Sequence, residues 1–89
     1  MRVKEGFVLR NVCGEYIIVP TGKMTLQFNG LMTINEVGVD LWNMLSNDVS
    51  IDDLVKGILD EYDIDEETAK KDIIEFIDYL NKYNVLKYD

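Results

Sequence analysis

The stretch from Gly30 to Gly38 constrains this chain most, because the spacing of apolar residues changes within it. Before it, short runs rich in β-branched and aromatic residues alternate at every second position, as strands do. After it, apolar residues recur at every third or fourth position, as on an amphipathic helix. Between the two patterns stands Asn35, a residue type that caps helix N-termini. The pattern predicts a strand-rich front and a helical back, which is an α+β fold.

Two runs in the front half, residues 7–12 and 16–20, predict an antiparallel pair. The Cys13-Gly14-Glu15 segment between them has hairpin-loop length and a glycine that tolerates positive φ. A third run, residues 24–28, alternates cleanly and is predicted as a strand. Residues 31–34 are predicted as the next strand.

The Asn29-Gly30 pair between these last two runs leaves two interpretations open. As a type I′ turn, which needs positive φ at both central residues, it separates two strands. As a bulge, it lies inside one longer strand. The predicted sheet therefore has three to four strands.

Three helices are predicted after Asn35, with N-caps at Asn35, Ser50 and Asp65. The last helix is expected to end at Asn84 in the left-handed conformation, with Val85 packing back on Leu80. The predicted buried stripes are Val37, Leu41, Met44 and Leu45; Leu54, Val55, Ile58 and Tyr62; and Ala69, Ile73, Phe76, Ile77, Leu80 and Tyr83, with Trp42 at the edge of the first. An antiparallel sheet followed by a three-helix bundle is a winged helix-turn-helix-like arrangement.

Length and charge narrow the class of protein. At 89 residues and 47% hydrophobic content, residues 1–89 suit one domain, with a core that buries about 60% of the unfolded surface. Nine basic residues against seventeen acidic ones give a net charge of −8, which disfavours nucleic acid and anionic membranes as partners. No signal-like or membrane-spanning run is recognisable, and the only cysteine, Cys13, suits a reducing compartment. We therefore expect a cytoplasmic protein.

The sequence offers little for catalysis. It has no histidine, no glycine-rich phosphate loop before a helix, and no evident group to activate Cys13. The numerous carboxylates fall at helix caps and on exposed helix faces, without the pattern of a calcium loop. A protein that is not an enzyme, with no metal and no cofactor, is expected.

Three kinds of binding remain open. A free sheet edge beside an amphipathic helix can capture an extended peptide by strand addition. An acidic winged-helix module could instead bind a protein regulator or DNA, although Asp72, Glu75 and Asp78 oppose phosphate contact along the third helix. Third, the edge could take a partner's strand, including that of a second copy in a homodimer.

The sequence resembles the PqqD-like family, also described as RiPP recognition elements, which are chaperones that bind leader segments of ribosomally made, post-translationally modified peptides. The resemblance covers nearly the whole chain. It is carried by residues 7–10, 14–22, 29–38, 41–42, 61–65 and 72–77.

The resemblance implies that a leader peptide adds as a strand to residues 31–34 and lies in a groove against the third helix. The implied peptide-binding residues are Leu31, Met32, Thr33, Ile34, Lys70, Ile74, Ile77, Asp78 and Asn81. Ile74 stands out as a bulky apolar residue on a polar face. The resemblance also implies a second partner, a modifying enzyme of the radical SAM/SPASM type. Two departures from the family pattern are the extra predicted strand at 24–28, which could cover the docking edge, and Asn84 where glycine is common.

Overall fold

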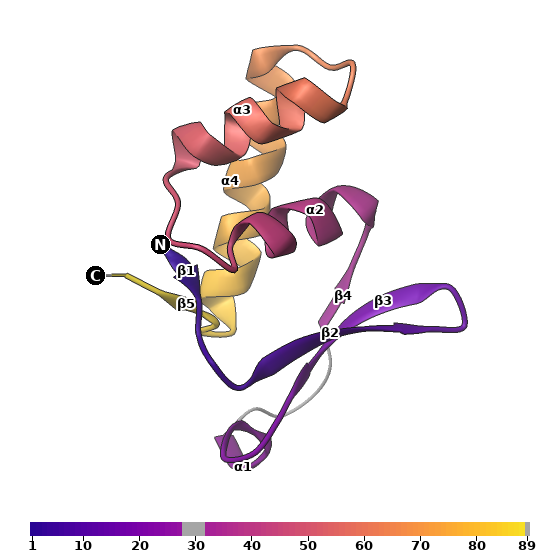
Figure 1. Ribbon diagram of the computed structural model, residues 1–89, viewed down its shortest axis with the longest axis vertical. Coiled ribbons are helices and arrows are strands. Elements are labelled where there is room, and N and C mark those ends of the chain that lie inside the picture. The colour runs from indigo at the N-terminus through magenta and orange to yellow at the C-terminus, as the bar shows by residue number, and fades with distance from the viewer. Residues whose placement is uncertain (28–31, 89) are drawn as a thin grey trace.

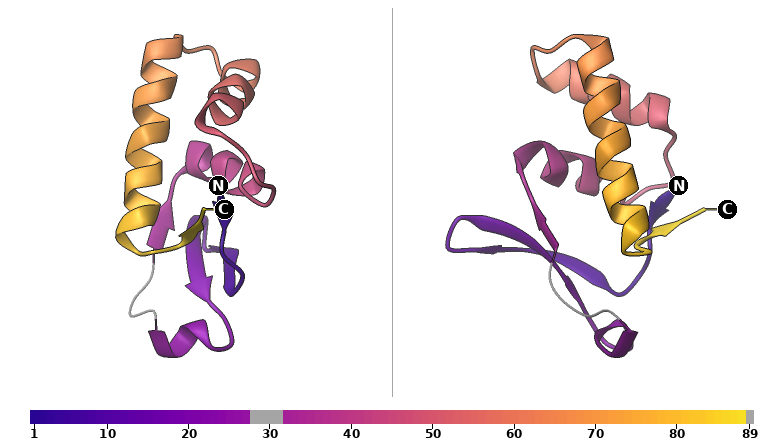
Figure 2. Two further views of the ribbon diagram at one scale, coloured as in Figure 1. Left: turned by 90° about the vertical axis from the view of Figure 1, so that its left-hand side faces the viewer. Right: turned by 180° about the vertical axis from the view of Figure 1, so that it is seen from behind.

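The computed structural model describes residues 1–27 and 32–88, and it confirms an α+β fold with an antiparallel sheet before the main helices (Figure 1). The strands are β1 (Arg2–Val3), β2 (Phe7–Val12), β3 (Glu15–Pro20), β4 (Met32–Ile34) and β5 (Leu86–Lys87). The helices are α1 (Met24–Gln27), α2 (Glu36–Met44), α3 (Ile51–Glu61) and α4 (Glu66–Lys82). The views of Figure 2 show α4 as the long element along which α3 and α2 are arranged, with the sheet below them.

The main sheet has the antiparallel order β2-β3-β4. The predicted hairpin between β2 and β3 is confirmed, and its turn is Cys13-Gly14, with φ values of 52° and 83°. Two successive positive φ values match the twist of the flanking strands. The Asn11 side chain accepts a hydrogen bond from the Gly14 amide at 3.1 Å.

The predicted strand at 24–28 is wrong over its described part, because Met24–Gln27 forms the short helix α1. The preceding turn sets this outcome through local hydrogen bonds. The amides of Met24, Thr25 and Leu26 donate to carbonyls three residues earlier, at 3.1, 3.2 and 3.3 Å. The Thr25 hydroxyl also donates to the Gly22 carbonyl at 2.7 Å. Leu26 is 91% exposed, so the alternating apolar residues of this segment do not form the buried face of a strand.

The Asn29-Gly30 pair lies outside the described residues, and so does the choice between turn and bulge. Within the described residues, β4 is an edge strand of the β2-β3-β4 sheet. The register pairs Ile17 with Thr33 and Ile18 with Met32. The edge that the sequence singled out therefore has β3 on one side only among these residues.

A small second sheet joins the first and last strands, and the sequence did not predict it. β1 pairs antiparallel with β5, with Val3 opposite Leu86 (Figure 1). The Val3 amide also donates to the Leu45 carbonyl at 2.9 Å. Two-residue strands carry a weak pattern, and only tertiary contact identifies them.

The predicted helix caps are confirmed. The Asn35 side chain accepts from the Gly38 amide at 2.8 Å, and Ser50 and Asp53 form a reciprocal capping box. The Asp65 carboxylate accepts from the Thr68 amide at 2.6 Å. These bonds satisfy amides that have no partner inside the helix.

The end of α4 is also as predicted. Asn84 has a φ of 57°, and the Val85 amide donates to the Leu80 carbonyl at 3.1 Å. Together with the bond from the Asn84 amide to the Asn81 carbonyl at 3.0 Å, this is a Schellman arrangement. It turns the chain back so that β5 meets β1.

The core lies between the helices and the inner face of the sheet. Its buried residues are Ile18, Met32, Leu41, Trp42, Leu45, Leu54, Val55, Ile58, Ala69, Ile73, Ile77, Leu80, Val85 and Leu86. Of the predicted stripes, Val37, Met44, Tyr62, Phe76 and Tyr83 are only partly buried, at the margins of this core. In the described parts of the chain, no helix has the length and apolar character needed to cross a bilayer.

Candidate functional site

A hollow of about 380 Å³ lies between the outer side of β4, the first turns of α2 and one flank of α4. We call it the β4 groove. It is lined by Thr33, Ile34, Asn35, Val37, Gly38, Leu41, Asp72, Glu75, Phe76 and Tyr79. Its apolar lining side chains are Ile34, Val37, Leu41 and Phe76, and α4 contributes the two carboxylates, Asp72 and Glu75.

Gly38 allows the two walls of the groove to approach each other. A Cβ placed on Gly38 would lie 3.0 Å from the Ile34 Cβ and 3.1 Å from the Phe76 Cε1. Both distances are below ordinary van der Waals contact, so the absent side chain lets the Phe76 ring lie close to the start of α2. A glycine inside a helix suggests close packing against a neighbouring element, and this packing is observed at Gly38.

The free edge of β4 meets α4 through Tyr79. The Tyr79 hydroxyl donates a hydrogen bond to the Thr33 carbonyl at 3.3 Å. Neighbouring residues of a strand direct their backbone groups to opposite edges, so Thr33 is the β4 residue that presents N–H and C=O toward α4. An extended chain entering the groove would find these two groups.

The Tyr79 ring is itself held from the other side. Its centroid lies 5.4 Å from that of Tyr83, with the planes at 74°, an edge-to-face geometry. The Lys82 ammonium lies 5.9 Å from the centre of the Tyr83 ring. The aromatic side of the groove is thus supported by neighbours on the same helix.

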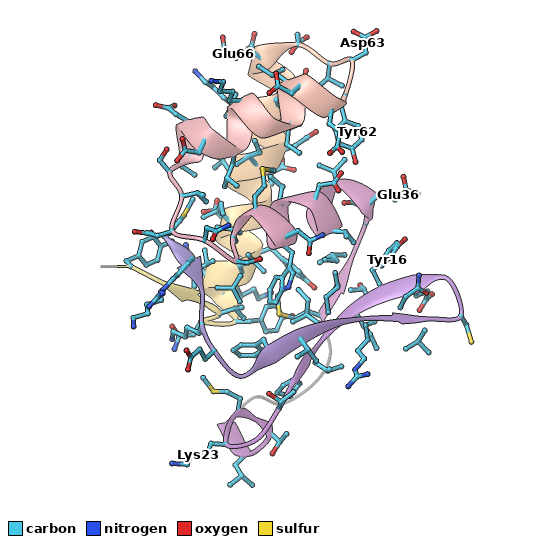
Figure 3. The ribbon with its side chains drawn as sticks, viewed as in Figure 1. Tyr16, Lys23, Glu36, Tyr62, Asp63 and Glu66 are labelled. Atoms are coloured by element: carbon cyan, nitrogen blue, oxygen red, sulfur yellow. The ribbon has the colours of Figure 1, made fainter. Side chains whose placement is uncertain are left out.

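A second hollow, of about 420 Å³, lies at the other side of β4, toward the β2–β3 hairpin. Thr33, Ile34 and Asn35 line both hollows, so β4 forms the ridge between them. The remaining lining residues are Gly14, Glu15, Tyr16 and Glu36. Figure 3 shows Tyr16 and Glu36 on this side, near the start of α2.

The structure separates the predicted site residues. Thr33 and Ile34 line the β4 groove, Met32 is fully buried in the core, and Leu31 lies outside the described residues. The predicted α4 residues do not line the groove. Lys70, Ile74, Asp78 and Asn81 are exposed, and Ile77 is buried. That these five contact a peptide stays a prediction.

The geometry of α4 explains this separation. At 100° per residue, Ile74 and Asn81 lie on one side of the buried stripe through Ile73 and Leu80, whereas Asp72 and Tyr79 lie on the other. Asn81 exchanges hydrogen bonds with the Tyr88 hydroxyl at 2.8 and 3.0 Å, and Lys70 lies 3.9 Å from Glu66. Sequence reasoning missed Asp72, Glu75 and Tyr79. Their spacing with Phe76 makes one helical stripe, which was the available signal.

A polar cluster ties α2 to the end of α3. The Tyr62 hydroxyl donates to the Asp40 carboxylate, and this bond raises the pKa of Tyr62 to about 12. The charge of Asp40 raises the pKa of Glu61 above its ordinary value. Figure 3 shows Tyr62 at the α3 end above Glu36. The cluster lies outside both hollows and connects two helices of the core.

Metal chemistry has little to build on in residues 1–27 and 32–88, where no group of three His, Cys, Asp or Glu side chains could hold an ion. Cys13 is exposed in the β2–β3 turn. Cys13 does not line the β4 groove.

A family model described as Coenzyme PQQ synthesis protein D (PqqD) matches residues 15–86 of the chain. This chain belongs to the PqqD family. The matched region contains β3, β4 and all the residues that line the β4 groove. A search of curated proteins found no match.

Two solved structures share the fold of this PqqD-family chain. One is TbiB1 in complex with the TbiA(beta) leader peptide, with a TM-score of 0.75 and 23% identity over 100% of this chain and 99% of that one. The other is lasso peptide synthetase B1 complexed with the leader peptide, with a TM-score of 0.72 and 14% identity over 94% and 93%. The predicted family is confirmed, and the winged-helix alternative, in which the chain binds a regulator or DNA, gains no support from these comparisons.

Proposed function

We propose that this PqqD-family chain is an adaptor that binds the leader segment of a ribosomally made precursor peptide. The observation that carries the proposal is the edge of β4, which faces a hollow partly lined by apolar side chains, with the Thr33 backbone directed into it. Support comes from the two solved structures of the same fold, both of which are complexes with leader peptides.

In the proposed complex, the leader lies along β4 as an added antiparallel or parallel strand. Its backbone hydrogen-bonds to Thr33 and displaces the Tyr79 hydroxyl from the Thr33 carbonyl. Main-chain bonds supply affinity in this mode of binding, and alternate side chains entering a pocket supply specificity. An apolar leader side chain would lie on the floor formed by Ile34, Val37 and Phe76.

The partner enzyme forms the second part of the proposal. Residues 1–89 act as one peptide-binding domain without catalytic residues or cofactor, in the cytoplasm where the precursor is translated. A modifying enzyme of the radical SAM/SPASM type, as the family resemblance implies, would carry out the chemistry on the presented core segment. A homodimer through the β4 edge would compete with the leader for the same backbone groups.

A fluorescence-anisotropy titration tests the proposal, using a labelled leader segment from a precursor encoded beside this chain. We expect saturable binding that Tyr79→Ala weakens by about tenfold or more, because truncating an aromatic anchor in an interface costs at least about 1 to 2 kcal/mol. Tyr79→Phe keeps the ring and need not give up the Thr33 bond, so it should bind at least as tightly as the parent protein.

Ile74→Ala decides between the two flanks of α4. A large loss with Ile74→Ala and none with Tyr79→Ala would place the leader on the flank predicted from the sequence. The absence of saturable binding by the leader, with and without the modifying enzyme, would overturn the proposed function.

A further inference from the structure

The charges around β4 have one sign. Asp72 and Glu75 line the β4 groove, and Glu15 and Glu36 line the hollow on the other side of the strand. Among the residues that the structure describes, no lysine or arginine lines either hollow. An extended chain lying over β4 would therefore pass between carboxylates on both sides.

These carboxylates are available to a ligand. Within the described residues, the ion pairs join the Met1 ammonium to Asp48 at 2.6 Å and Lys70 to Glu66 at 3.9 Å, and neither pair includes a lining carboxylate. Asp72 and Glu75 are both exposed. Their charges are thus not neutralised by a contact with a neighbouring cation.

The carboxylates that line the two hollows beside β4 are not simply a consequence of the net negative charge of the chain. The hollow beside the β1-β5 sheet is lined by Arg2, Lys4, Glu5 and Lys87, three of which are basic. That sheet lies on the opposite side of the molecule from the start of α2, where Glu36 is labelled (Figures 1 and 3). The surface is therefore segregated, with the negative side at the β4 edge.

We propose that the β4 groove selects leader segments in which lysine or arginine residues flank an apolar anchor. This inference rests on the proposed function and specifies the peptide that it concerns. Asp72 and Glu75 are about 4.5 Å apart along the axis of α4, and alternate residues of a strand are about 6.8 Å apart. One arginine can contact both carboxylates, or two basic residues at alternate positions can contact one each.

The expected contribution is to selection more than to total affinity. Exposed charge pairs are screened, and each typically changes affinity by about two- to fivefold. Complementary charges also raise the association rate and reject peptides of the wrong sign. An acidic leader would meet like charges on both sides of β4.

Selection of binding peptides from a displayed random library, with this chain as the target, tests the inference. Peptides of about 15 residues are long enough for one strand with flanking residues. We expect the wild-type chain to enrich peptides with lysine or arginine within two positions of an apolar or aromatic residue. The Asp72→Asn/Glu75→Gln variant should still enrich apolar peptides but lose the basic preference.

A matched variant separates local contact from the overall field. Asp63→Asn/Glu67→Gln also removes one aspartate and one glutamate charge, but at exposed positions around the start of α4, away from both hollows. It should retain the basic preference. For the most enriched peptide, replacing lysine or arginine by glutamine should weaken binding to the wild-type chain about threefold to tenfold, and binding to Asp72→Asn/Glu75→Gln by less than twofold.

The outcomes are distinguishable. Enrichment of peptides with no excess of basic residues would overturn the charge inference and leave the proposed function standing. An equal loss of basic preference in the two double variants would overturn it as well, since the overall field would then explain the selection. Enrichment of no peptide, together with no binding of the encoded leader, would overturn both.

Discussion

At the scale of single residues, Gly38 is the position on which the candidate site depends most. In the first turn of α2 a glycine costs about 1 kcal/mol relative to alanine. Its neighbours explain why it is tolerated, because Ile34 and Phe76 occupy the space of a side chain at 3.0 and 3.1 Å. The Ile34 Cβ is attached to the backbone of β4, so it moves only if the edge strand moves.

Gly38→Ala should therefore be net destabilising by about 1 kcal/mol and should weaken leader binding. Overpacking costs about 1 to 3 kcal/mol, and the gain in helix propensity of about 1 kcal/mol offsets only part of it. Urea unfolding and leader titration measure the two effects. Gly57→Ala on α3 is the matched control, because there the added Cβ meets the movable thioether end of Met44 at 2.5 Å. If Gly38→Ala gained as much stability as Gly57→Ala, the proposed tight approach would be wrong.

At the scale of the elements, carboxylates at the helix ends make the stability of the fold depend on pH in opposite directions. Hydrogen bonds from the Ser50 and Thr68 amides lower the pKa of Asp53 and Asp65, so these caps stabilise the fold above the ordinary pKa of 3.8. That stability is lost as the pH falls through the lowered values. Glu61 at the end of α3 behaves differently, because the charge of Asp40 raises its pKa.

The sign for Glu61 follows from linkage. A raised pKa in the folded state means that stability is full below the ordinary value of 4.5 and is lost as the pH rises through the raised value. At pH 7 the ionised Glu61 therefore lies in the unfavourable field of the Asp40 charge, between α3 and α2. Glu61→Gln should be more stable than the parent protein at pH 7.

Thermal unfolding at two pH values checks this prediction. The stability difference between Glu61→Gln and the parent protein should disappear below pH of about 4, where the glutamic acid is itself neutral. A difference that is the same at both pH values would show that the charge of Asp40 is not its cause.

At the scale of the whole molecule, the β1-β5 sheet joins the two ends of the chain beneath the helices. Leu86 in β5 is 4% exposed and belongs to the same core as Leu45 and Leu80. The Val3 amide bonds to the Leu45 carbonyl, and the Lys4 amide bonds to the Val85 carbonyl. This sheet thus fixes the relation between the end of α2 and the end of α4, on the far side from the β4 groove.

Leu86→Ala is expected to lower the free energy of unfolding by about 3 kcal/mol, because it removes buried methyl groups and leaves a cavity. Leader affinity measured well below the unfolding temperature should change by less than about twofold, since no groove residue contributes to this sheet. Lys87→Ala, at an exposed position of the same strand, is the control and should leave stability nearly unchanged. A loss of leader binding without unfolding would show that the two sheets are coupled.

Much of this fold could be predicted because its signals are local. The Cys13-Gly14 turn, the caps at Asn35, Ser50 and Asp65, and the left-handed Asn84 each depend on a few adjacent residues, and all are as predicted. Helical periodicity likewise identified most of the buried stripe of α4, and the pattern before Asn35 identified a strand there, whose free edge is given by the structure.

The outcome at three places depended on contacts that a local pattern does not encode. Residues 24–27 alternate like a strand but close into a helix, because the preceding turn supplies hydrogen bonds and no buried face is present for Leu26. The β1-β5 pairing joins residues that are 85 and 83 positions apart, so neither short strand was recognisable alone. The third place is α4, because the local pattern did not identify which flank of this helix faces β4.

The sequence by itself determined the β2-β3 hairpin, the strand before Asn35 and the three long helices after it, since alternation, periodicity and capping act over a few residues. It also determined that a strand would precede the first long helix, but whether the edge of that strand is free was left open. Only the tertiary structure decided what that strand faces. The approach of Phe76 over Gly38 and the reach of Tyr79 to Thr33 set the rotation of α4, and this rotation brings Asp72 and Glu75, not Lys70 and Ile74, to the groove. A helix with a polar surface on both sides of its buried stripe carries no local signal for which side meets the sheet.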